Sequence, residues 1–215
     1  MQKPILYSYF RSSCSYRVRI ALNLKEVKFE TRAKHLVKGE NNLEDYKRLN
    51  PMGQVPFFVH DGVGIAQSMA IIEYIDQVFS SGQSLFPKSA GDAARVRQIC
   101  EMINSGIQPH QNLSTGIEMK KWFGIDDEQK TKWWAFWIER GFVAIEKVLE
   151  ETAGNFAFGD QVTAADAFIV PQVFNAKRFN LDMSKFPLIS KVSGNAESLE
   201  AFKRAHPSKQ PDSES

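Results

Sequence analysis

The chain has 215 residues, enough for one large domain or two small ones. Its 27 basic and 25 acidic residues leave a formal charge of +2, which is too balanced to favour nucleic acid as the main partner. The two cysteines, Cys14 and Cys100, make neither a disulfide framework nor a metal-binding pair, so we expect a cytoplasmic protein without a metal site. No apolar run approaches the ~18 residues of a membrane span, and no signal peptide is recognisable.

Strand and helix patterns alternate through the first third of the chain. Hydrophobic spacing and turn residues predict, in chain order, a strand at 4–10, a helix at 16–25, a strand at 27–33, a short helix at 42–50, two strands joined at Asp61-Gly62, and a helix at 68–79. The Asp-Gly dipeptide is typical of a β-hairpin. Ser68 is the expected N-cap of the last helix.

After residue 80 the strand patterns stop. Residues 81–91 are rich in Ser and Gly and are interpreted as a linker. Helices are predicted at 92–108, 127–151 and 162–179, and the residues from His206 onward are expected to be loose. In the second of these helices, Trp133, Phe136 and Trp137 share a face that we interpret as the core face, continued by Ala144, Ile145 and Val148. Thr163 and Asp166 have the spacing of a capping box.

These patterns together predict a fold of the α/β plus all-α class. An α/β domain at residues 1–80 is followed by the linker at 81–91 and a helical domain at 92–215.

The segment Ser12-Ser13-Cys14-Ser15 lies between the first predicted strand and the first predicted helix. Such a turn presents free N–H groups and the positive end of a helix dipole, which favour a thiolate, carboxylate or phosphate. A plain helix cap is the bland alternative, and a monothiol mechanism through Cys14 is a minor one. A dithiol mechanism is disfavoured because Arg17 stands where the second cysteine would be. No glycine supports a phosphate loop, and no histidine is placed as a partner for a nucleophilic serine.

Two further segments narrow the choice of ligand. Val55-Pro56 precedes a predicted strand, and a cis bond there would expose the backbone of Val55 to a peptide-like ligand. Gln67-Ser68 opens a second helix whose N-terminus can receive a carboxylate. Glutathione carries a thiol, a peptide backbone and carboxylates, and therefore suits this combination.

Several motifs also carry a family resemblance. "SSCSYRVRIAL", "NPMGQVP", "QSMAIIEYI", "GIQPHQNLS", "GDQVTAADAFIVPQ" and "RFNLDMSKFP" together resemble the zeta-class glutathione transferases over nearly the whole chain. The resemblance implies a thioredoxin-like N-terminal domain, a helical C-terminal domain, a homodimer and glutathione as cofactor. It further implies maleylacetoacetate isomerase activity on an anionic substrate in tyrosine and phenylalanine breakdown.

The resemblance also implies roles for individual residues. Ser12 would hydrogen-bond the glutathione sulfur, Ser13 and Cys14 would line the catalytic pocket, and Arg178 would bind the substrate carboxylate. The remaining glutathione contacts are assigned to Ser15, Tyr16, Arg17, Val55, Gln67, Ser68, Gln108, Asn112, Leu113 and Ser114. The chain departs from the family pattern at Tyr16, at His110 and in the longer segment 115–127.

Two alternatives to the isomerase remain open. One is a general glutathione transferase that acts on α-haloacids or other electrophiles at the same site. The other, of a different class, is a non-catalytic scaffold with the same fold. The presence of Ser12 and of Gln67-Ser68 argues against the scaffold, which should have lost them.

Overall fold

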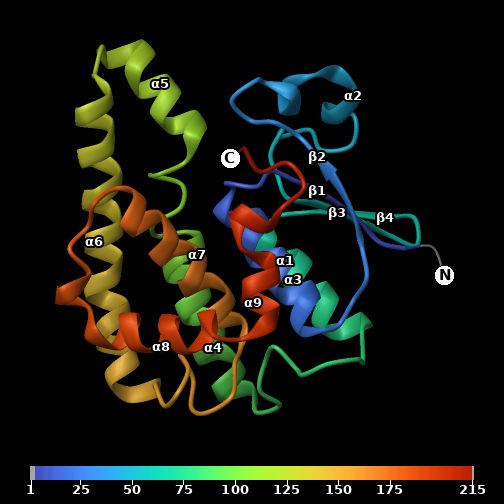
Figure 1. Cartoon of the computed structure of the whole chain (residues 1–215), viewed down its shortest axis with the longest axis vertical. Helices are drawn as coiled ribbons and strands as arrows, with labels where there is room; N and C mark the ends of the chain where they lie inside the picture. The colour runs from blue at the N-terminus through green and yellow to red at the C-terminus, as the bar shows by residue number, and fades with distance from the viewer. Residues whose placement is uncertain (1–2, 215) are drawn as a thin grey trace. The chain divides into compact units, whose positions relative to one another are not determined.

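The computed structural model describes residues 3–214, which form two compact units (Figure 1). The first unit contains the described residues up to Leu85 and those from Ser198 onward, and the second spans Phe86–Glu197. We expected the helical domain to run from 92 to 215, so the placement of 198–214 differs from the sequence-based boundary. Contacts of this segment with the first helix account for the difference: Arg19 Nε donates to the Ala205 carbonyl and Asn23 Nδ2 to the Ala201 carbonyl.

A four-stranded mixed sheet in the order β2-β1-β3-β4 organises the first unit. Its strands are β1 (Ile5–Ser8), β2 (Glu30–Ala33), β3 (Phe57–His60) and β4 (Val63–Ala66). β1 pairs in parallel with β2 and antiparallel with β3, and β3 and β4 form the hairpin predicted at Asp61-Gly62. Both turn residues have positive φ, 46° and 80°, as a two-residue hairpin of the favoured type requires. The thioredoxin-like fold is confirmed, although the first two strands are shorter than predicted.

The helices of the first unit are α1 (Ser13–Leu24), α2 (Glu44–Lys47), α3 (Ser68–Val78) and α9 (Glu200–Ala205), with short 3-10 turns at Glu40–Asn42 and Pro207–Lys209. α1 packs against both α3 and α9 (Figure 1). Fully buried apolar side chains from these helices and the sheet, including those of Ile20, Ile71 and Phe58, form the core. Burial of this apolar surface fixes the two helix N-termini relative to the strand ends.

The second unit is helical throughout its described elements: α4 (Ala90–Asn104), α5 (Leu113–Phe123), α6 (Asp127–Thr152), α7 (Ala164–Arg178) and α8 (Pro187–Glu197), with a 3-10 turn at Met183–Lys185. α7 is its central helix, in contact with α4, α6 and α8. α5 was not predicted; Asn112 caps its start and Gly124, with φ of 65°, ends it. Across the described residues of both units, no helix is long and apolar enough to cross a membrane.

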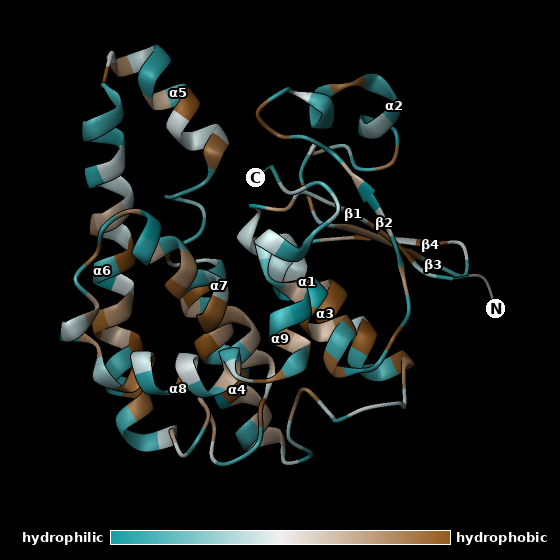
Figure 2. Ribbon diagram, in the orientation of Figure 1, coloured by the Kyte–Doolittle hydropathy of each residue, from teal (hydrophilic) through white to brown (hydrophobic). Residues whose placement is uncertain are grey.

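The predicted core face of α6 is wrong except at Ile145. The buried positions are Trp134, Ile138, Phe142, Ile145 and Leu149, whereas Phe136 is 53% exposed and Ala144 is also exposed. α6 accordingly shows alternating hydrophilic and hydrophobic bands along its length (Figure 2). The bulky aromatic residues misled the prediction because the half-buried Trp133 and Trp137 contact the α4–α5 connection at His110 instead of the central core.

The expectation of a loose segment after His206 is also wrong. Gln210 Nε2 donates to the carbonyls of Arg204 and His206. Asp212 Oδ2 accepts the N–H of Phe10 at 2.9 Å, and Glu214 lies 2.9 Å from His35 Nε2. Polar composition suggested disorder, but these side chains find specific partners that are distant in sequence.

The predicted capping box at the start of α7 is confirmed. Asp166 Oδ2 accepts the Thr163 N–H at 2.8 Å, and Oδ1 accepts the Ala157 N–H at 2.8 Å. Burial raises the pKa of the Asp166 carboxyl to about 6, although these donors oppose the rise. Because the pKa of this carboxyl in the unfolded chain is about 4, the native state binds the proton more tightly than the unfolded state does. The protonated carboxyl therefore stabilises the native state fully below pH ~4, and this contribution is lost as pH rises through ~6.

We therefore predict that Asp166→Asn removes one pH-dependent contribution to stability. The free energy of unfolding of the wild type, minus that of the variant, should fall between pH 4 and 6 by a total on the order of 3 kcal/mol. Urea unfolding at several pH values measures this difference. Asp182→Asn, at an exposed carboxylate of the same unit, is the control and should not remove the effect. Parallel profiles for wild type and Asp166→Asn would contradict the prediction.

Candidate active site

The loop between β1 and α1 turns sharply before Ser12. The Ser12 N–H donates to the Tyr9 carbonyl at 3.0 Å, which closes a β-turn. Ser12 is the N-cap of α1, and its Oγ accepts the N–H of Ser15 at 3.2 Å. The helix thus begins at Ser13, three residues before the predicted start. As a cap, Ser12 uses its oxygen as an acceptor, and its hydroxyl hydrogen is not donated within the described part of the chain.

The first turn of α1 offers further donors. The Tyr16 N–H donates to the Ser12 carbonyl, and Ser15 is capped, but no described residue accepts the N–H of Ser13 or Cys14. Both residues are half-buried at the positive end of a twelve-residue helix. The Ser12 hydroxyl and these two N–H groups are therefore available to an anion.

Behind this turn lie Ser15, Tyr16 and Arg17, all buried. These three were predicted as glutathione contacts, and the structure places their side chains inside the protein. Arg17 Nη1 donates to Ser68 Oγ at 3.2 Å and so links α1 to the first residue of α3. The arrangement holds the two helix N-termini together.

The Val55-Pro56 peptide bond is cis, as the sequence suggested. The described residues supply no hydrogen-bond partner to the main chain of Val55, which leaves its N–H and C=O available to an extended ligand. The carbonyl of the preceding Gln54 accepts bonds of 2.7 Å from both Tyr46 Oη and Asn50 Nδ2. Burial raises the pKa of the Tyr46 phenol, so it remains a donor. Sequence reasoning missed this support because neither residue is close to a recognisable motif.

Gln67, not Ser68, occupies the N-cap position of α3. Its side chain is exposed, makes no capping bond and reaches only the Met52 sulfur, at 3.6 Å. Its φ of 71° and ψ of 118° are unusual for a residue with a side chain and store about 1–3 kcal/mol of strain. Ser68 is buried and accepts the bond from Arg17. Strain combined with an uncapped helix N-terminus is typical of a binding position.

The other predicted contacts lie in the second unit, on the connection that leads from α4 into α5: Gln108, Asn112, Leu113 and Ser114. Asn112 is the N-cap of α5. Its Oδ1 accepts two hydrogen bonds from Ser114, one from the N–H at 3.0 Å and one from the hydroxyl at 2.9 Å. The neighbouring Gln111 forms a reciprocal, buried amide pair with Gln172 of α7, at 2.8 and 3.2 Å. Sequence reasoning missed this pair because an isolated glutamine carries no motif.

His110 stacks on Trp137, with ring centroids 3.7 Å apart, and its carbonyl accepts the Trp133 indole N–H at 3.0 Å. The residue that departs from the family pattern therefore anchors the α4–α5 connection on α6.

Arg178, exposed at the last position of α7, lies near Asn175 and two aromatic rings. Its Nη1 donates to Asn175 Oδ1 at 3.4 Å, and its guanidinium carbon lies 5.4 Å from the Phe179 ring centroid. The Phe179 ring is 4.9 Å from that of Trp134, which also packs against Gly116 of α5. Trp134 thus connects the end of α7 with α5.

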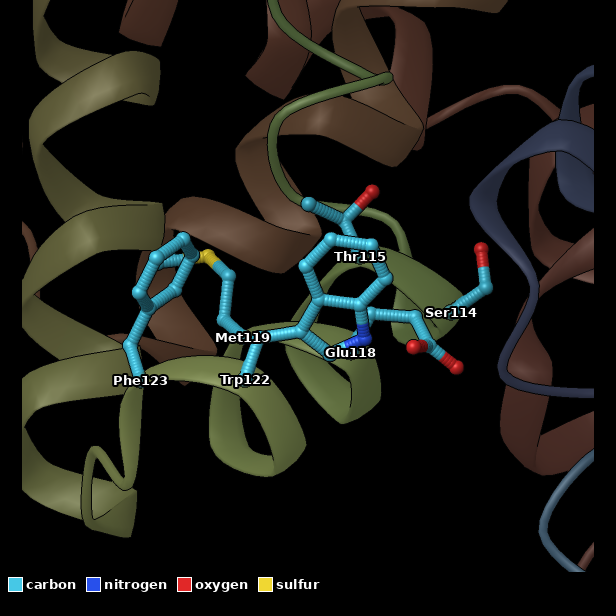
Figure 3. Close-up of a pocket in the computed structure, with 6 residues that line it drawn as sticks. All are labelled: Ser114, Thr115, Glu118, Met119, Trp122 and Phe123. Atoms are coloured by element: carbon cyan, nitrogen blue, oxygen red, sulfur yellow. The ribbon is translucent and has the colours of Figure 1, made fainter.

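One face of α5 lines an open groove of about 460 Å³ (Figure 3). Its lining residues are Ser114, Thr115, Glu118, Met119, Trp122 and Phe123, which recur at helical spacing. The groove is predominantly apolar, and its polar side-chain groups are the hydroxyls of Ser114 and Thr115 and the carboxylate of Glu118.

Comparison with known proteins agrees with this geometry. Residues 3–77 match the model of the glutathione S-transferase N-terminal domain. The chain is 46% identical over 212 residues to the mouse maleylacetoacetate isomerase, covering 98% of this chain and 95% of that protein. The chain belongs to the zeta-class glutathione transferases. Its fold matches a bacterial zeta-class maleylpyruvate isomerase with a TM-score of 0.94, at 39% identity over 98% of this chain and 100% of the other.

Membership of this family makes the chain a glutathione-dependent enzyme of the isomerase and transferase type. A maleylacetoacetate isomerase from Anaeromyxobacter dehalogenans, with glutathione in its active site, matches with a TM-score of 0.87 at 38% identity, covering 99% of this chain and 98% of that one. Glutathione is thus the cofactor, and its functional groups can be compared with the hydrogen-bonding groups of the first unit. The two N–H groups, the Ser12 hydroxyl and the Val55 backbone suit its sulfur and its peptide groups.

We predict that Ser12→Ala folds but loses activity roughly 10- to 100-fold, because a hydrogen bond to a charged acceptor contributes about 1.5–3 kcal/mol. Steady-state kinetics with saturating glutathione at pH 7 measure the loss. Ser89→Ala is the matched control, since it removes the N-cap of α4, where Ser89 accepts the Asp92 N–H. Cys14→Ser should remain active. Full activity of Ser12→Ala would transfer the role to Ser13 or the backbone.

Proposed function

We propose that the chain converts maleylacetoacetate to fumarylacetoacetate with glutathione as a recycled cofactor. The observation that carries this proposal is the group of unused donors at the N-terminus of α1. These donors are the Ser12 hydroxyl and the N–H groups of Ser13 and Cys14, which are available to an anion. The identity of 46% to the mouse maleylacetoacetate isomerase supports the choice of substrate.

The chain's own task in this reaction is to stabilise a thiolate. Bound glutathione supplies the thiolate that adds to the alkene, permits rotation and leaves again, so that no glutathione is consumed. A thiol of pKa ~8.5 is only about 3% ionised at pH 7, and lowering that pKa by ~2 units takes about 2.7 kcal/mol. A hydroxyl bond to the anion contributes about 1.5–3 kcal/mol and a helix N-terminus up to ~2 kcal/mol. Ser12 and α1 therefore suffice without a general base.

The remaining residues bind and orient. The Val55 main chain pairs with the peptide part of glutathione, and Gln67 with the first turn of α3 receives the γ-glutamyl end. In the second unit, Arg178 holds a substrate carboxylate, and Gln108, Asn112 and Ser114 supply additional polar contacts.

A second candidate substrate is maleylpyruvate, because the chain is 39% identical to a bacterial maleylpyruvate isomerase, although a maleylacetoacetate isomerase matches the fold with the same TM-score of 0.94. Both compounds contain a maleyl group, a cis alkene conjugated to carbonyl groups, so the same thiolate chemistry applies. Which of the two is turned over faster identifies the physiological class.

The deciding experiment incubates the protein with each maleyl compound and a catalytic amount of glutathione. We expect the trans product to exceed the added glutathione many-fold, with no reaction when glutathione is omitted. Stoichiometric consumption of glutathione would instead support a general transferase, which α-haloacids would test next. Absence of any reaction, together with failure to bind glutathione, would support the scaffold alternative.

The assembly and setting are part of the same proposal. We place the enzyme in the cytoplasm, in tyrosine and phenylalanine breakdown, as a homodimer. Exposed apolar side chains such as Val63, Val78 and Val143 are available for subunit contact. Sedimentation of a 24.4 kDa monomer at micromolar concentration would contradict the dimer.

For Arg178→Lys we predict a rise in KM for the anionic substrate of roughly tenfold, the factor that ~1.4 kcal/mol represents. A planar guanidinium holds a carboxylate with two parallel bonds, which an ammonium cannot reproduce. The Kd for glutathione, measured on the same variant, should be unchanged. Lys177→Ala, at the exposed neighbour, is the control. If the KM and the Kd weakened equally, Arg178 would support the fold or the glutathione site instead.

A further inference from the structure

The segment 206–214, which we call the strap, lies against the loop that carries Ser12. Its main contact is Asp212, whose Oδ2 accepts the N–H of Phe10 at 2.9 Å. The other oxygen, Oδ1, is buried and has no hydrogen-bond partner in the described part of the chain. A carboxylate held in this way, 202 positions from its partner in sequence, is unusual for a segment of polar composition.

The accepted N–H lies at a critical point of the loop. Tyr9 and Ser12 close the β-turn, and Phe10 and Arg11 are its two central residues. The N–H of the first central residue has no partner within a β-turn and must find one outside. Phe10 is buried, so water is a poor substitute, and Asp212 supplies the acceptor.

A second charged group holds the other side of the same residue. Arg19 Nη2 donates to the Phe10 carbonyl at 3.1 Å, while Nη1 donates to Ser8 Oγ at 3.0 Å and to the Tyr9 carbonyl at 3.4 Å. Both main-chain groups of Phe10 are thus bound by charged side chains of opposite sign. The turn has little freedom to change, and its last residue is Ser12.

We propose that Asp212 is a positioning residue for the thiolate site: by holding the Phe10 N–H it fixes the turn that presents the Ser12 hydroxyl. The inference rests on the proposed function, because it assigns Ser12 to the glutathione sulfur. Asp212 itself does not touch the reacting atoms. It acts through the backbone of Phe10 and Arg11.

Positioning and charge make opposite predictions for the thiol of bound glutathione. If Asp212 acted only through its negative charge, removing it would lower the pKa of the thiol, because a nearby anion opposes thiolate formation. If it positions Ser12, removing its hydrogen bond would raise that pKa, since the thiolate would lose a well-placed donor.

The experiment measures the thiol pKa of bound glutathione from the pH dependence of thiolate absorbance. We expect Asp212→Ala to raise it by about one unit and to weaken kcat/KM at pH 7 about tenfold, the population change that one pKa unit represents. Asp212→Asn keeps an acceptor for the Phe10 N–H and loses the charge, so it should show a thiol pKa at or below the wild-type value. Asp212→Ser, too short to reach Phe10, replaces Asp212→Ala if the latter does not fold.

Two controls separate positioning from general damage. S-methylglutathione, which has no thiol, should bind Asp212→Ala within about twofold of the wild-type Kd, because only the Ser12 contact is disturbed. Glu214→Gln removes a second carboxylate of the strap, one that forms ion pairs with His35 and Lys38, lies in the field of the Arg11 side chain and accepts no hydrogen bond from the main chain of the turn. It should not raise the thiol pKa.

The outcomes distinguish this inference from the proposed function. An unchanged or lowered thiol pKa in Asp212→Ala, or equal weakening of glutathione and S-methylglutathione, would overturn the positioning role while leaving the function intact. A wild-type protein that binds neither ligand would overturn the function itself.

Discussion

The guanidinium of Arg19 is the contact on which the active-site loop depends. It lies buried beneath the end of β1 and donates to the Ser8 hydroxyl and to the carbonyls of Tyr9, Phe10 and Ala205. Burial lowers its pKa to about 10, so it remains charged at neutral pH, with Asp212 as the principal favourable charge. The Tyr9 carbonyl also accepts the Ser12 N–H, whereas the carbonyls of Phe10 and Ala205 would otherwise be buried polar groups without compensation. One side chain therefore fixes the strand end, the loop and α9 together.

The first unit shows how a fixed backbone creates an anion site. The cis bond before Pro56, the positive φ of Gln67 and the turn at Tyr9–Ser12 are three departures from regular structure close to the predicted ligand contacts. The main chain of Val55 beside the cis bond, and the N–H groups of Ser13 and Cys14 just after the turn, have no hydrogen-bond partner among the described residues. Buried side chains hold them: Arg19 for the turn, Tyr46 for the segment before Val55, and Arg17 for the start of α3. Hydrogen bonds from these buried side chains thus fix the positions of the main-chain groups at the predicted ligand contacts.

Local patterns predicted the elements whose cause is local. The Asp61-Gly62 hairpin, the Thr163–Asp166 capping box and the helix at 68–79 follow from two to twelve neighbouring residues. Features with distant causes were not predictable in this way. The buried face of α6 depends on which helices pack against it, and the order of the strap depends on Phe10 and His35. The apolar stretch around Arg17 and Arg19 did contain a usable signal, because charged residues within an apolar helix imply buried partners.

The residue roles assigned to the site were less accessible to sequence than the fold, since they depend on which atoms remain unused. Ser12 and Asn112 are both helix caps, and for Ser12 a plain cap was the alternative to a functional role in the sequence analysis. The two roles are compatible, because capping uses only some of the polar atoms of each side chain. A capping oxygen accepts from the helix, while the hydroxyl hydrogen of Ser12 and the amide group of Asn112 remain available on half-buried residues.

Asp166 shows the contrasting case among the helix-start residues. Its carboxylate is almost fully buried, and both oxygens already accept hydrogen bonds from Ala157 and Thr163. No lone pair faces a ligand, so this residue can only support the fold. Helix starts with the same residue types therefore divide into structural and functional ones by exposure and by the donors left over. Spacing along the chain does not reveal that division, because Ser12 and Thr163 both lie three residues before the partner that completes the cap.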